Sequence, residues 1–354
     1  MSSVSATRRL PAEWEPQSGV MLTWPHASGD WAPVLDEVEP VFLDIATAVA
    51  RRENLLVNCS DRQQAGRLRQ ALLDRGIDGE RLFFQLTPSD DTWARDHGAL
   101  TVIDDGRPLL LDFRFNGWGN KYPADRDNLI NARLASAGVF GPGTMEHVEL
   151  VLEGGSIDSD GCGTLLTTSA CLLNPQRNPD LSQAEIESLL LTLFGADRLL
   201  WLDHGCIEGD DTDSHIDMLV RFADTRTLVY QSCDETDYSC YGSLKAMEHA
   251  LTKLRNADGQ PYRLVALPWP QPRFDRDGRR MPASYANFLC VNDAVLLPVY
   301  GDPADTAAVE CLQQCFPDRE IVPVDCLPLI AQHGSLHCLT MQFPAGVDFR
   351  RTDI

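Results

Sequence analysis

Four short segments carry residue types that could form a reaction site. The first, residues 90–98 (DDTWARDHG), places carboxylates, an indole and a histidine between two apolar runs. Loops at strand ends often assemble binding and catalytic sites. The alternative for this segment is a solvated turn, stabilised by hydrogen bonds from the Asp90 and Asp91 side chains to the backbone.

The second segment, residues 153–156 (EGGS), directly follows an apolar run at 148–152. Paired glycines let the backbone approach a ligand closely, and a carboxylate at Glu153 could serve as an acid or a base. A hairpin turn explains the two glycines about as well, so this segment is informative only together with the others.

The third segment, residues 209–218 (GDDTDSHIDM), leads into a predicted strand. Side chains alternate along an extended chain, so Asp213, His215 and Asp217 are expected on one face. Three ionisable groups on one face would be costly to bury without a ligand. The segment could instead be an exposed edge strand, or a divalent-metal site that uses His and carboxylate ligands, although it does not match an EF-hand loop.

The fourth segment, residues 333–342 (HGSLHCLTMQ), places Cys338 at the start of the last apolar run. A cysteine acts as a nucleophile through its thiolate, and the groups that favour the thiolate must lie near it in space. Position alone therefore leaves a buried structural cysteine as the alternative.

Short β-type runs alternate with amphipathic helical stretches along the whole chain, which indicates a mixed α/β fold. The expected strands lie at 19–24, 54–58, 82–86, 99–103, 109–115, 148–152, 164–168, 198–202, 216–222, 227–231, 263–267, 286–291, 294–299, 320–324 and 337–343. The expected helices lie near 32–52, 61–75, 127–138, 182–194, 242–256 and 303–316.

Strands outnumber helices in this assignment, which disfavours a doubly wound sheet. Ser182 followed by Glu185 is a capping-box signal for the start of one helix. No linker or charge block divides the chain, so a single domain over residues 1–354 is expected.

Composition excludes several classes of protein. A length of 354 residues with 44% hydrophobic residues is enough for a real core, and the net charge of −22 would repel nucleic-acid phosphates but attract a small cation. No apolar run is long enough to span a membrane, and no export signal is recognisable. The eleven cysteines include no C-x-x-C pair. Reduced thiols in a cytoplasmic protein are therefore expected.

Taken in order, the motifs W-x-R-D-x-G, L-E-G-G-S, D-T-x-S-H-I-D and H-C-L-T resemble the agmatine deiminase and bacterial-type (Porphyromonas-type) peptidyl-arginine deiminase family. This family belongs to the guanidino-group-modifying (pentein) superfamily. Further similarity lies at 10–16, 22–25, 115–119, 171–179 and 283–288, so it covers nearly the whole chain. The resemblance implies a five-bladed, pseudo-fivefold α/β propeller, a homodimer, and no metal or organic cofactor.

The resemblance also implies a reaction, the hydrolysis of agmatine to N-carbamoylputrescine and ammonia in polyamine (putrescine) metabolism. Cys338 would attack the guanidinium carbon and form a covalent thiouronium intermediate, with His215 acting first as acid and then as base. A guanidinium carries its N–H donors in a planar fork that carboxylates match, a role for Asp96 and Asp217. Glu153 would hold His215 or a guanidinium nitrogen.

The far end of agmatine is an ammonium group, which favours acidic or aromatic surroundings. The candidates for this end of the substrate site are Trp93, Trp118, Asp210 and Asp211, with Gly154 allowing close backbone approach. Departures from the commoner family pattern at Ser214, Met218 and Ser335 leave an arginyl peptide or another alkylguanidine as alternative substrates. The alternative of a different class is a metal-dependent hydrolase built on His204, Asp211, Asp213, His215 and Asp217.

Overall fold

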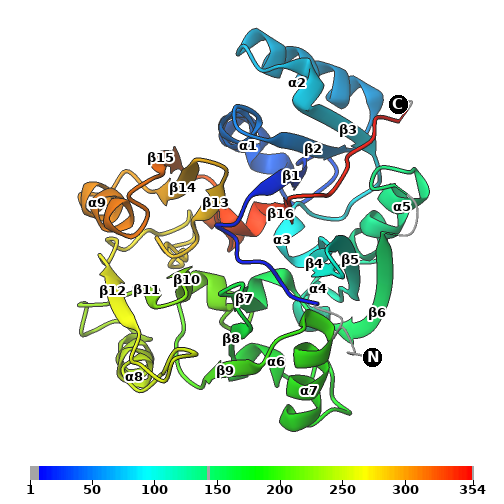
Figure 1. Ribbon diagram of the computed structural model, residues 1–354. Helices are drawn as coiled ribbons and strands as arrows, with labels where there is room; N and C mark the ends of the chain where they lie inside the picture. The colour runs from blue at the N-terminus through cyan, green and yellow to red at the C-terminus, as the bar shows by residue number, and fades with distance from the viewer. Residues whose placement is uncertain (1–7, 142–143, 353–354) are drawn as a thin grey trace, which may run out of the picture.

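Five small β-sheets surround a common centre in the computed structural model (Figure 1). The structure describes residues 8–141 and 144–352. Residues 1–7, part of the stretch in which no export signal is expected, lie outside the described residues. The mixed α/β class is confirmed, and the ring of five sheets corresponds to the blades of the expected propeller.

One strand pattern is repeated in all five sheets. Two strands pair antiparallel, and a helical connection then leads from the second of them to a third strand that pairs with it in parallel. The last strand of the chain, β16 (Thr340–Pro344), pairs antiparallel with the first, β1 (Gln17–Thr23). This pairing completes the first blade and closes the ring, because it joins the two ends of the chain.

The spatial strand orders are β16-β1-β2-β3, β4-β5-β6, β7-β8-β9, β10-β11-β12 and β13-β14-β15. The remaining strands are β2 (Asn54–Cys59), β3 (Leu82–Leu86), β4 (Leu100–Asp104), β5 (Arg107–Arg114), β6 (Met145–Val151), β7 (Ile157–Ser159), β8 (Thr164–Thr168), β9 (Arg198–Leu202), β10 (Val220–Asp224), β11 (Thr227–Gln231), β12 (Arg263–Leu267), β13 (Leu289–Val291), β14 (Ala294–Val299) and β15 (Glu320–Asp325).

The outer helices are α1 (Leu35–Ala50), α2 (Arg62–Asp74), α5 (Ile130–Ser136), α7 (Gln183–Phe194), α8 (Tyr241–Leu251) and α9 (Asp305–Cys315). Short helical turns lie between them and nearer the centre: α3 (Ala94–His97), α4 (Gly117–Asn120), α6 (Ser169–Leu172), and the 3-10 turns η1 (Ala32–Val34), η2 (Gly79–Arg81), η3 (Asp127–Leu129), η4 (Gly154–Ser156), η5 (Ile216–Met218), η6 (Ile330–Gln332) and η7 (His337–Leu339).

Local sequence signals account for the ends of helix α7. Ser182 Oγ accepts a hydrogen bond from the Glu185 amide, and the Glu185 carboxylate accepts one from the Ser182 amide at 2.8 Å, which confirms the predicted capping box. The helix ends at Gly195, whose φ of 59° lies in the left-handed region. Glycine suits this position because a Cβ there would lie 1.9 Å from the Arg8 carbonyl oxygen.

The expected strands are present, but three of them are shorter than predicted. The strands expected at 216–222, 286–291 and 337–343 begin only at Val220, Leu289 and Thr340, because a turn occupies the first residues of each prediction. Strand β7 was not predicted, since its sequence Ile-Asp-Ser has no apolar run, yet it pairs with β8 inside the third blade. The three strands that begin later than predicted all do so at the centre of the ring.

The expectation that all cysteines are reduced is wrong for one pair. Cys206 and Cys240 form a disulfide, and their Cα atoms lie 5.7 Å apart. The other nine cysteines are free. The pairing could not be read from spacing, because the fold brings the loop that follows β9 against the start of α8.

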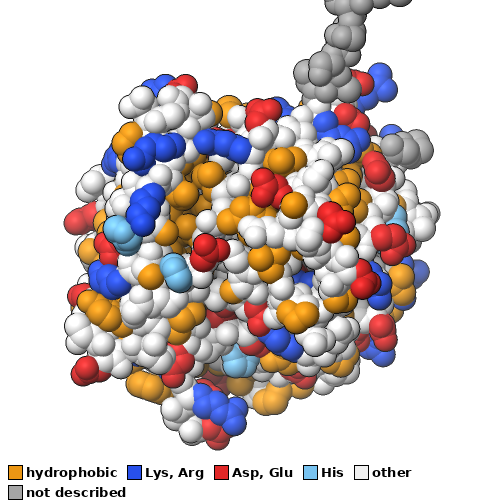
Figure 2. Space-filling view, turned by 90° about the horizontal axis from the view of Figure 1, so that it is seen from below, with side chains coloured by type: hydrophobic (Ala, Val, Ile, Leu, Met, Phe, Trp, Pro, Cys, Tyr) orange, Lys and Arg blue, Asp and Glu red, His pale blue; other side chains and the backbone are white. Residues whose placement is uncertain are grey.

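Acidic, basic and hydrophobic side chains are interspersed on the face shown in Figure 2. The excess of negative charge is therefore not gathered into one field on that face. Within the described residues, no helix combines the length and the hydrophobicity that crossing a membrane would require.

Candidate active site

Five side chains at the centre come from equivalent positions in the five blades. They stand just before the strand that opens each blade's antiparallel pair, and they are Asp96, Glu153, Asp217, Asn287 and Cys338. The short turns that carry most of them pack together, with α3 against η7 and η4, and η4 against η5. The pseudo-fivefold repeat thus gathers residues that are far apart in sequence.

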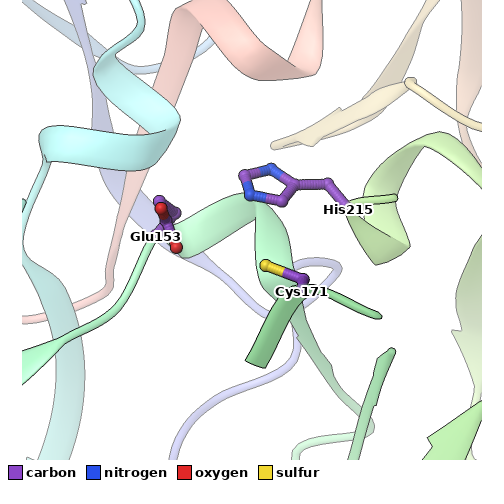
Figure 3. Close-up of side chains that lie close together, drawn as sticks. All are labelled: Glu153, Cys171 and His215. Atoms are coloured by element: carbon purple, nitrogen blue, oxygen red, sulfur yellow. The ribbon is translucent and has the colours of Figure 1, made fainter. Parts of the chain in front are cut away.

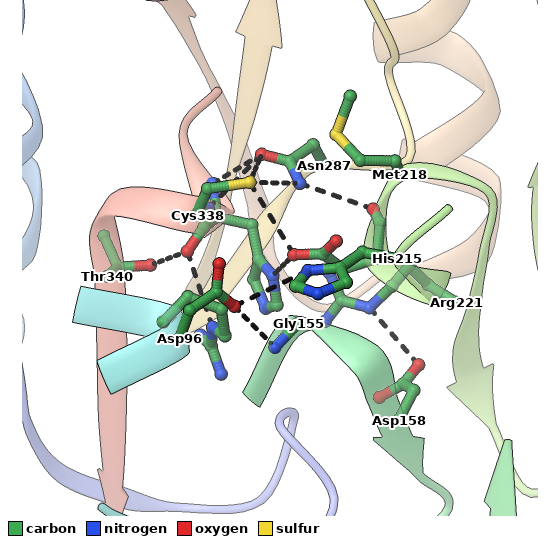
Figure 4. A network of polar contacts seen from close by, with 12 residues as sticks. Asp96, Gly155, Asp158, His215, Met218, Arg221, Asn287, Cys338 and Thr340 are labelled. Carbon is green, nitrogen blue, oxygen red and sulfur yellow. Dashed lines mark hydrogen bonds and ion pairs between the residues drawn. The ribbon is translucent and has the colours of Figure 1, made fainter. Parts of the chain in front are cut away.

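Cys338 presents its sulfur to an amide and a carboxylate (Figure 4). It lies in η7 and is 4% exposed. Asn287 Nδ2 donates to Sγ at 3.2 Å, and Asp217 Oδ2 lies 3.8 Å from Sγ. Burial, together with the negative charges of Asp217 and Asp96, raises the pKa of the Cys338 thiol well above its ordinary value. A cation bound between the carboxylates would counter this effect.

Asp96 is fixed by two donors. Its Oδ2 accepts from Trp118 Nε1 at 2.9 Å and its Oδ1 from the Gly155 amide at 3.0 Å. The backbone of Trp118 is left-handed, with φ of 56°, which is uncommon for a large side chain and is found at functional sites. Burial raises the pKa of Asp96 to about 6, although the nearby charge of His215 acts in the opposite direction. The two donors therefore hold the Asp96 carboxylate in one orientation.

Asp217 offers one free oxygen. Its Oδ2 lies 2.7 Å from His337 Nδ1, whereas its buried Oδ1 has no hydrogen-bond partner among the described residues. Although burial alone would raise it, the hydrogen bond with His337 and the charges around it lower the pKa of Asp217. A charged, partly unsatisfied carboxylate is a suitable acceptor for guanidinium N–H groups.

His215 is completely buried beside Glu153 (Figure 3). Its Nδ1 lies 3.6 Å from Asp96 Oδ1, and neither ring nitrogen has a hydrogen-bond partner among the described residues. Although burial would lower it, the charge of Asp96, aided by Cys171 and Glu153, raises the pKa of His215 well above its ordinary value. Both Glu153 oxygens accept from Arg177 Nε at 2.9 Å, so Glu153 acts on His215 through its charge.

A cavity of about 190 Å³ leads to the thiol. Cys338 and Asp96 are its most buried lining side chains, and exposed Asp30 lies at its rim. Aromatic and acidic side chains also line the cavity, namely Trp93, Trp118, Tyr122, Asp91 and Asp211. No Lys or Arg of the described residues lines this cavity.

Three residues predicted to bind substrate do not line the cavity: Asp217, which lies behind the thiol at 3.8 Å from Sγ, Asp210 and Gly154. The Asp210 carboxylate accepts from the Thr212 amide and hydroxyl and from the Ser214 amide, so it shapes the loop before His215. At Gly154, a Cβ would lie 2.2 Å from the Arg95 carbonyl oxygen. Its missing side chain allows two backbone segments to pack closely.

The predicted alternation of side chains at 213–217 is wrong. Asp213 and Ser214 have φ of 67° and 69°, and η5 follows, so this segment is not extended. His215 and Asp217 do reach the same site, but through turns. Asp213 instead pairs with Arg177 Nη1 at 2.8 Å and Lys121 Nζ at 2.8 Å.

Sequence reasoning assigned no role to several residues that position the site. Asn287 contacts the thiol, Arg177 holds Glu153, and His337 bridges Asp217 and Glu13. Each lies in or next to a motif that carries the family resemblance, and this position was the only sequence feature that could have indicated its role.

The ligand set of the predicted metal hydrolase is not assembled. His204 is exposed, and Asp213 is paired with two cations. Among the described residues, the side chains that lie close enough together to hold a metal ion are Glu153, Cys171 and His215. Only His215 belongs to the predicted set.

Comparison with known proteins supports a common architecture. The Porphyromonas-type peptidyl-arginine deiminase family matches residues 9–344. The structure of a candidate arginine deiminase from Porphyromonas gingivalis is 48% identical, with a TM-score of 0.90 and coverage of 97% of this chain and all of that one.

Proteins described as agmatine deiminases are also similar. The C. jejuni agmatine deiminase, solved as a cysteine-to-serine variant with substrate bound, is 32% identical, with a TM-score of 0.88 over 100% of this chain and 99% of that one. The agmatine deiminase of Stutzerimonas stutzeri is 33% identical over 98% of this chain and 99% of its own length.

Proposed function

Because the chain belongs to the Porphyromonas-type peptidyl-arginine deiminase family, we propose that it is a guanidine deiminase whose substrate is agmatine. The reaction consumes water and yields N-carbamoylputrescine and ammonia. The cysteine-to-serine variant of the C. jejuni agmatine deiminase, solved with its substrate, supports this choice.

One observation carries the proposal, namely the distribution of charge along the cavity. Asp96 and Asp217 flank the buried thiol, where a planar guanidinium needs paired acceptors. Asp30, Asp91 and Asp211 line the rest of the path, without a Lys or Arg among the described lining residues. This lining favours a substrate that is cationic at both ends, as agmatine is.

The first chemical step uses the buried thiol. His215 already favours its charged form, so the Cys338 proton leaves to solvent when the guanidinium enters between the carboxylates. The thiolate then attacks the guanidinium carbon and forms a C–S bond. His215 donates its proton to the departing nitrogen, the C–N bond breaks, and ammonia leaves a covalent S-alkylthiouronium.

The second step returns the enzyme to its starting state. Water enters where ammonia left, and neutral His215 accepts a proton from it as the oxygen attacks the same carbon. The C–S bond breaks as the hydroxyl proton of this adduct passes to the departing sulfur, so the ureido product forms and Cys338 returns to its thiol form. Every bond made or broken involves substrate, water, Cys338 or His215, so the mechanism requires no metal or organic cofactor.

Arginine, free or in a peptide, is the second candidate substrate. The 48% identity with the Porphyromonas gingivalis protein favours it. An α-carboxylate of free arginine, however, would face Asp30, Asp91 and Asp211 instead of a basic partner. Electrostatic repulsion should therefore select against it.

Ammonia release from agmatine, arginine and a benzoyl-arginine ester tests the proposal, each with and without EDTA. We expect turnover of agmatine, no effect of EDTA, and no activity in Cys338→Ala. Cys326→Ala, which removes another buried thiol, is the matched control and should retain turnover. Activity that survives Cys338→Ala, or that EDTA abolishes, would contradict the mechanism, and preference for either arginine substrate would contradict the substrate.

The proposal includes the cellular and assembly context. We place the enzyme in the cytoplasm, supported by nine free cysteines against a single disulfide among the described residues. We also propose that it is a homodimer with one catalytic domain per chain and that it has no nucleic-acid partner. Closure of the ring by β1 and β16 supports the single domain, and the net charge of −22 supports the lack of a nucleic-acid partner. Light scattering in solution tests the dimer.

A further inference from the structure

Three side chains converge beside the catalytic thiol but away from the cavity lining. Glu153, Cys171 and His215 each offer one ligand atom, and these atoms all lie within 4.8 Å of one another (Figure 3). They come from three separate elements, the residue before η4, helix α6 and the residue before η5. All three are buried.

His215 supplies a second observation that points to a ligand. It is 0% exposed, and neither of its ring nitrogens makes a hydrogen bond among the described residues, although Nδ1 lies 3.6 Å from the Asp96 carboxylate. Buried polar atoms are normally hydrogen-bonded, so a fully buried imidazole without a single hydrogen bond requires an explanation. Proton transfer to substrate needs only one of the two nitrogens.

We propose that Glu153, Cys171 and His215 form an inhibitory site for a thiophilic divalent cation of the zinc class. One thiolate, one imidazole and one carboxylate are the donor types that Zn²⁺ prefers, whereas Mg²⁺ and Ca²⁺ prefer oxygen donors alone. On binding, Cys171 loses its proton to solvent and its sulfur coordinates the ion. Three protein ligands leave a fourth position for water.

The charges around the site can accommodate such an ion. Arg177 holds both Glu153 oxygens, but it also donates to Asp213 Oδ2 at 2.8 Å and to the Thr212 carbonyl at 2.9 Å. Glu153 can therefore turn one oxygen to the ion while Arg177 keeps its other partners. The Asp96 carboxylate, 3.6 Å from His215, adds negative charge nearby.

The consequence for activity rests on the proposed function. A His215 that is bound to a cation cannot give a proton to the departing nitrogen or take one from water. Occupation of this site therefore stops deimination without touching Cys338, and removal of the ion restores it.

The binding test uses Co²⁺ as a spectroscopic substitute for Zn²⁺ in the Cys338→Ala variant. This background lacks the catalytic thiol, so its result does not depend on which substrate the enzyme takes. We expect one equivalent of Co²⁺ to give a thiolate-to-metal charge-transfer band. The band should disappear in Cys338→Ala/Cys171→Ala and persist in Cys338→Ala/Cys162→Ala, which removes an exposed thiol instead.

The activity test compares Zn²⁺ inhibition of wild type and Cys171→Ala. With each protein measured relative to its own metal-free rate, we expect the variant to need roughly 10- to 100-fold more Zn²⁺ for half inhibition. EDTA should reverse the inhibition of wild type.

Three outcomes would overturn the site: no charge-transfer band in Cys338→Ala, a band that survives loss of Cys171, or equal Zn²⁺ sensitivity of wild type and Cys171→Ala. A band that depends on Cys171, in a protein that deiminates no guanidine, would support the metal site and overturn only the proposed function.

Discussion

The Nδ1 atom of His337 lies 2.7 Å from Oδ2 of Asp217, so the residue next to Cys338 holds the carboxylate that we propose to bind the guanidinium. The other ring nitrogen, Nε2, lies 2.6 Å from Glu13 Oε2. Glu13 is anchored in turn by Arg221 Nη2 at 2.9 Å. This buried chain of contacts leaves Asp217 Oδ1 free and fixes its direction.

Two substitutions at His337 should separate these contacts. The amide nitrogen of an asparagine can replace Nδ1, and that of a glutamine can replace Nε2. We therefore expect His337→Gln, which loses the Asp217 contact, to reduce kcat/KM by roughly 100-fold through misplacement of that carboxylate. His337→Asn should lose clearly less activity. Steady-state kinetics checks which variant loses more activity, and thermal unfolding is the control for folding. Equal losses of kcat/KM in two equally stable variants would refute the role of His337 in positioning Asp217.

The reactivity of Cys338 should depend on pH and on bound cations. Burial raises its pKa well above the ordinary value, so the thiol is protonated, and unreactive, until the pH passes that raised pKa. The rate of iodoacetamide labelling of Cys338 in the free enzyme, followed by mass spectrometry, should still be rising at about pH 9. Guanidinium ion should shift the profile to lower pH. A plateau below about pH 8 without any cation would contradict this picture.

Asp91 should contribute to substrate binding more than to chemistry. It lines the cavity, whereas its neighbour Asp90 accepts a hydrogen bond from the Arg126 amide and does not line it. We expect Asp91→Asn to raise KM for agmatine roughly 3- to 10-fold with little change in kcat, since one partly exposed charge is worth about 1 kcal/mol. The matched variant Asp90→Asn should leave KM unchanged. Equal increases of KM in the two variants would show that the Asp91 charge has no specific role in substrate binding.

The same carboxylate predicts a pH effect on KM. Burial raises the pKa of Asp91 to about 6, so the group is neutral below that pH and its attraction for a cation is lost. KM of wild type should therefore increase as the pH falls through 6. Asp91→Asn should show a smaller increase, because Asp96, whose pKa is also raised to about 6, still titrates. An identical pH profile in both proteins would exclude Asp91 as the origin.

Glycine substitutions should distinguish the site from the scaffold. A Cβ on Gly155 would lie 2.6 Å from His215 Nδ1 and 2.8 Å from Asp96 Oδ1, so Gly155→Ala should lower kcat/KM by roughly 100-fold. Gly66 lies inside α2 with open space around it. Gly66→Ala should keep full activity and stabilise the fold by about 0.5–1 kcal/mol, seen as a higher Tm. Wild-type activity in Gly155→Ala would mean that His215 and Asp96 can move away from the added Cβ without loss of function.

Signals confined to a few neighbouring residues were readable from the sequence. The Ser182–Glu185 capping box and the apolar strands needed only local information, and both are present. The segment at 213–217 was misread because alternation assumes an extended backbone. Asp213 and Ser214 instead adopt left-handed conformations, which depend on contacts with distant residues such as Arg177.

The sequence by itself determined the mixed α/β class, the order of most elements and, through its motifs, the residues proposed for the chemistry. Only the tertiary structure decided which oxygen of Asp217 is free, which thiol pairs with Cys206, and that Cys171 and Glu153 meet at His215. The physical reason is closure of the ring by β1 and β16. Strand patterns arise from neighbouring residues, whereas the site exists only where five distant turns share one centre.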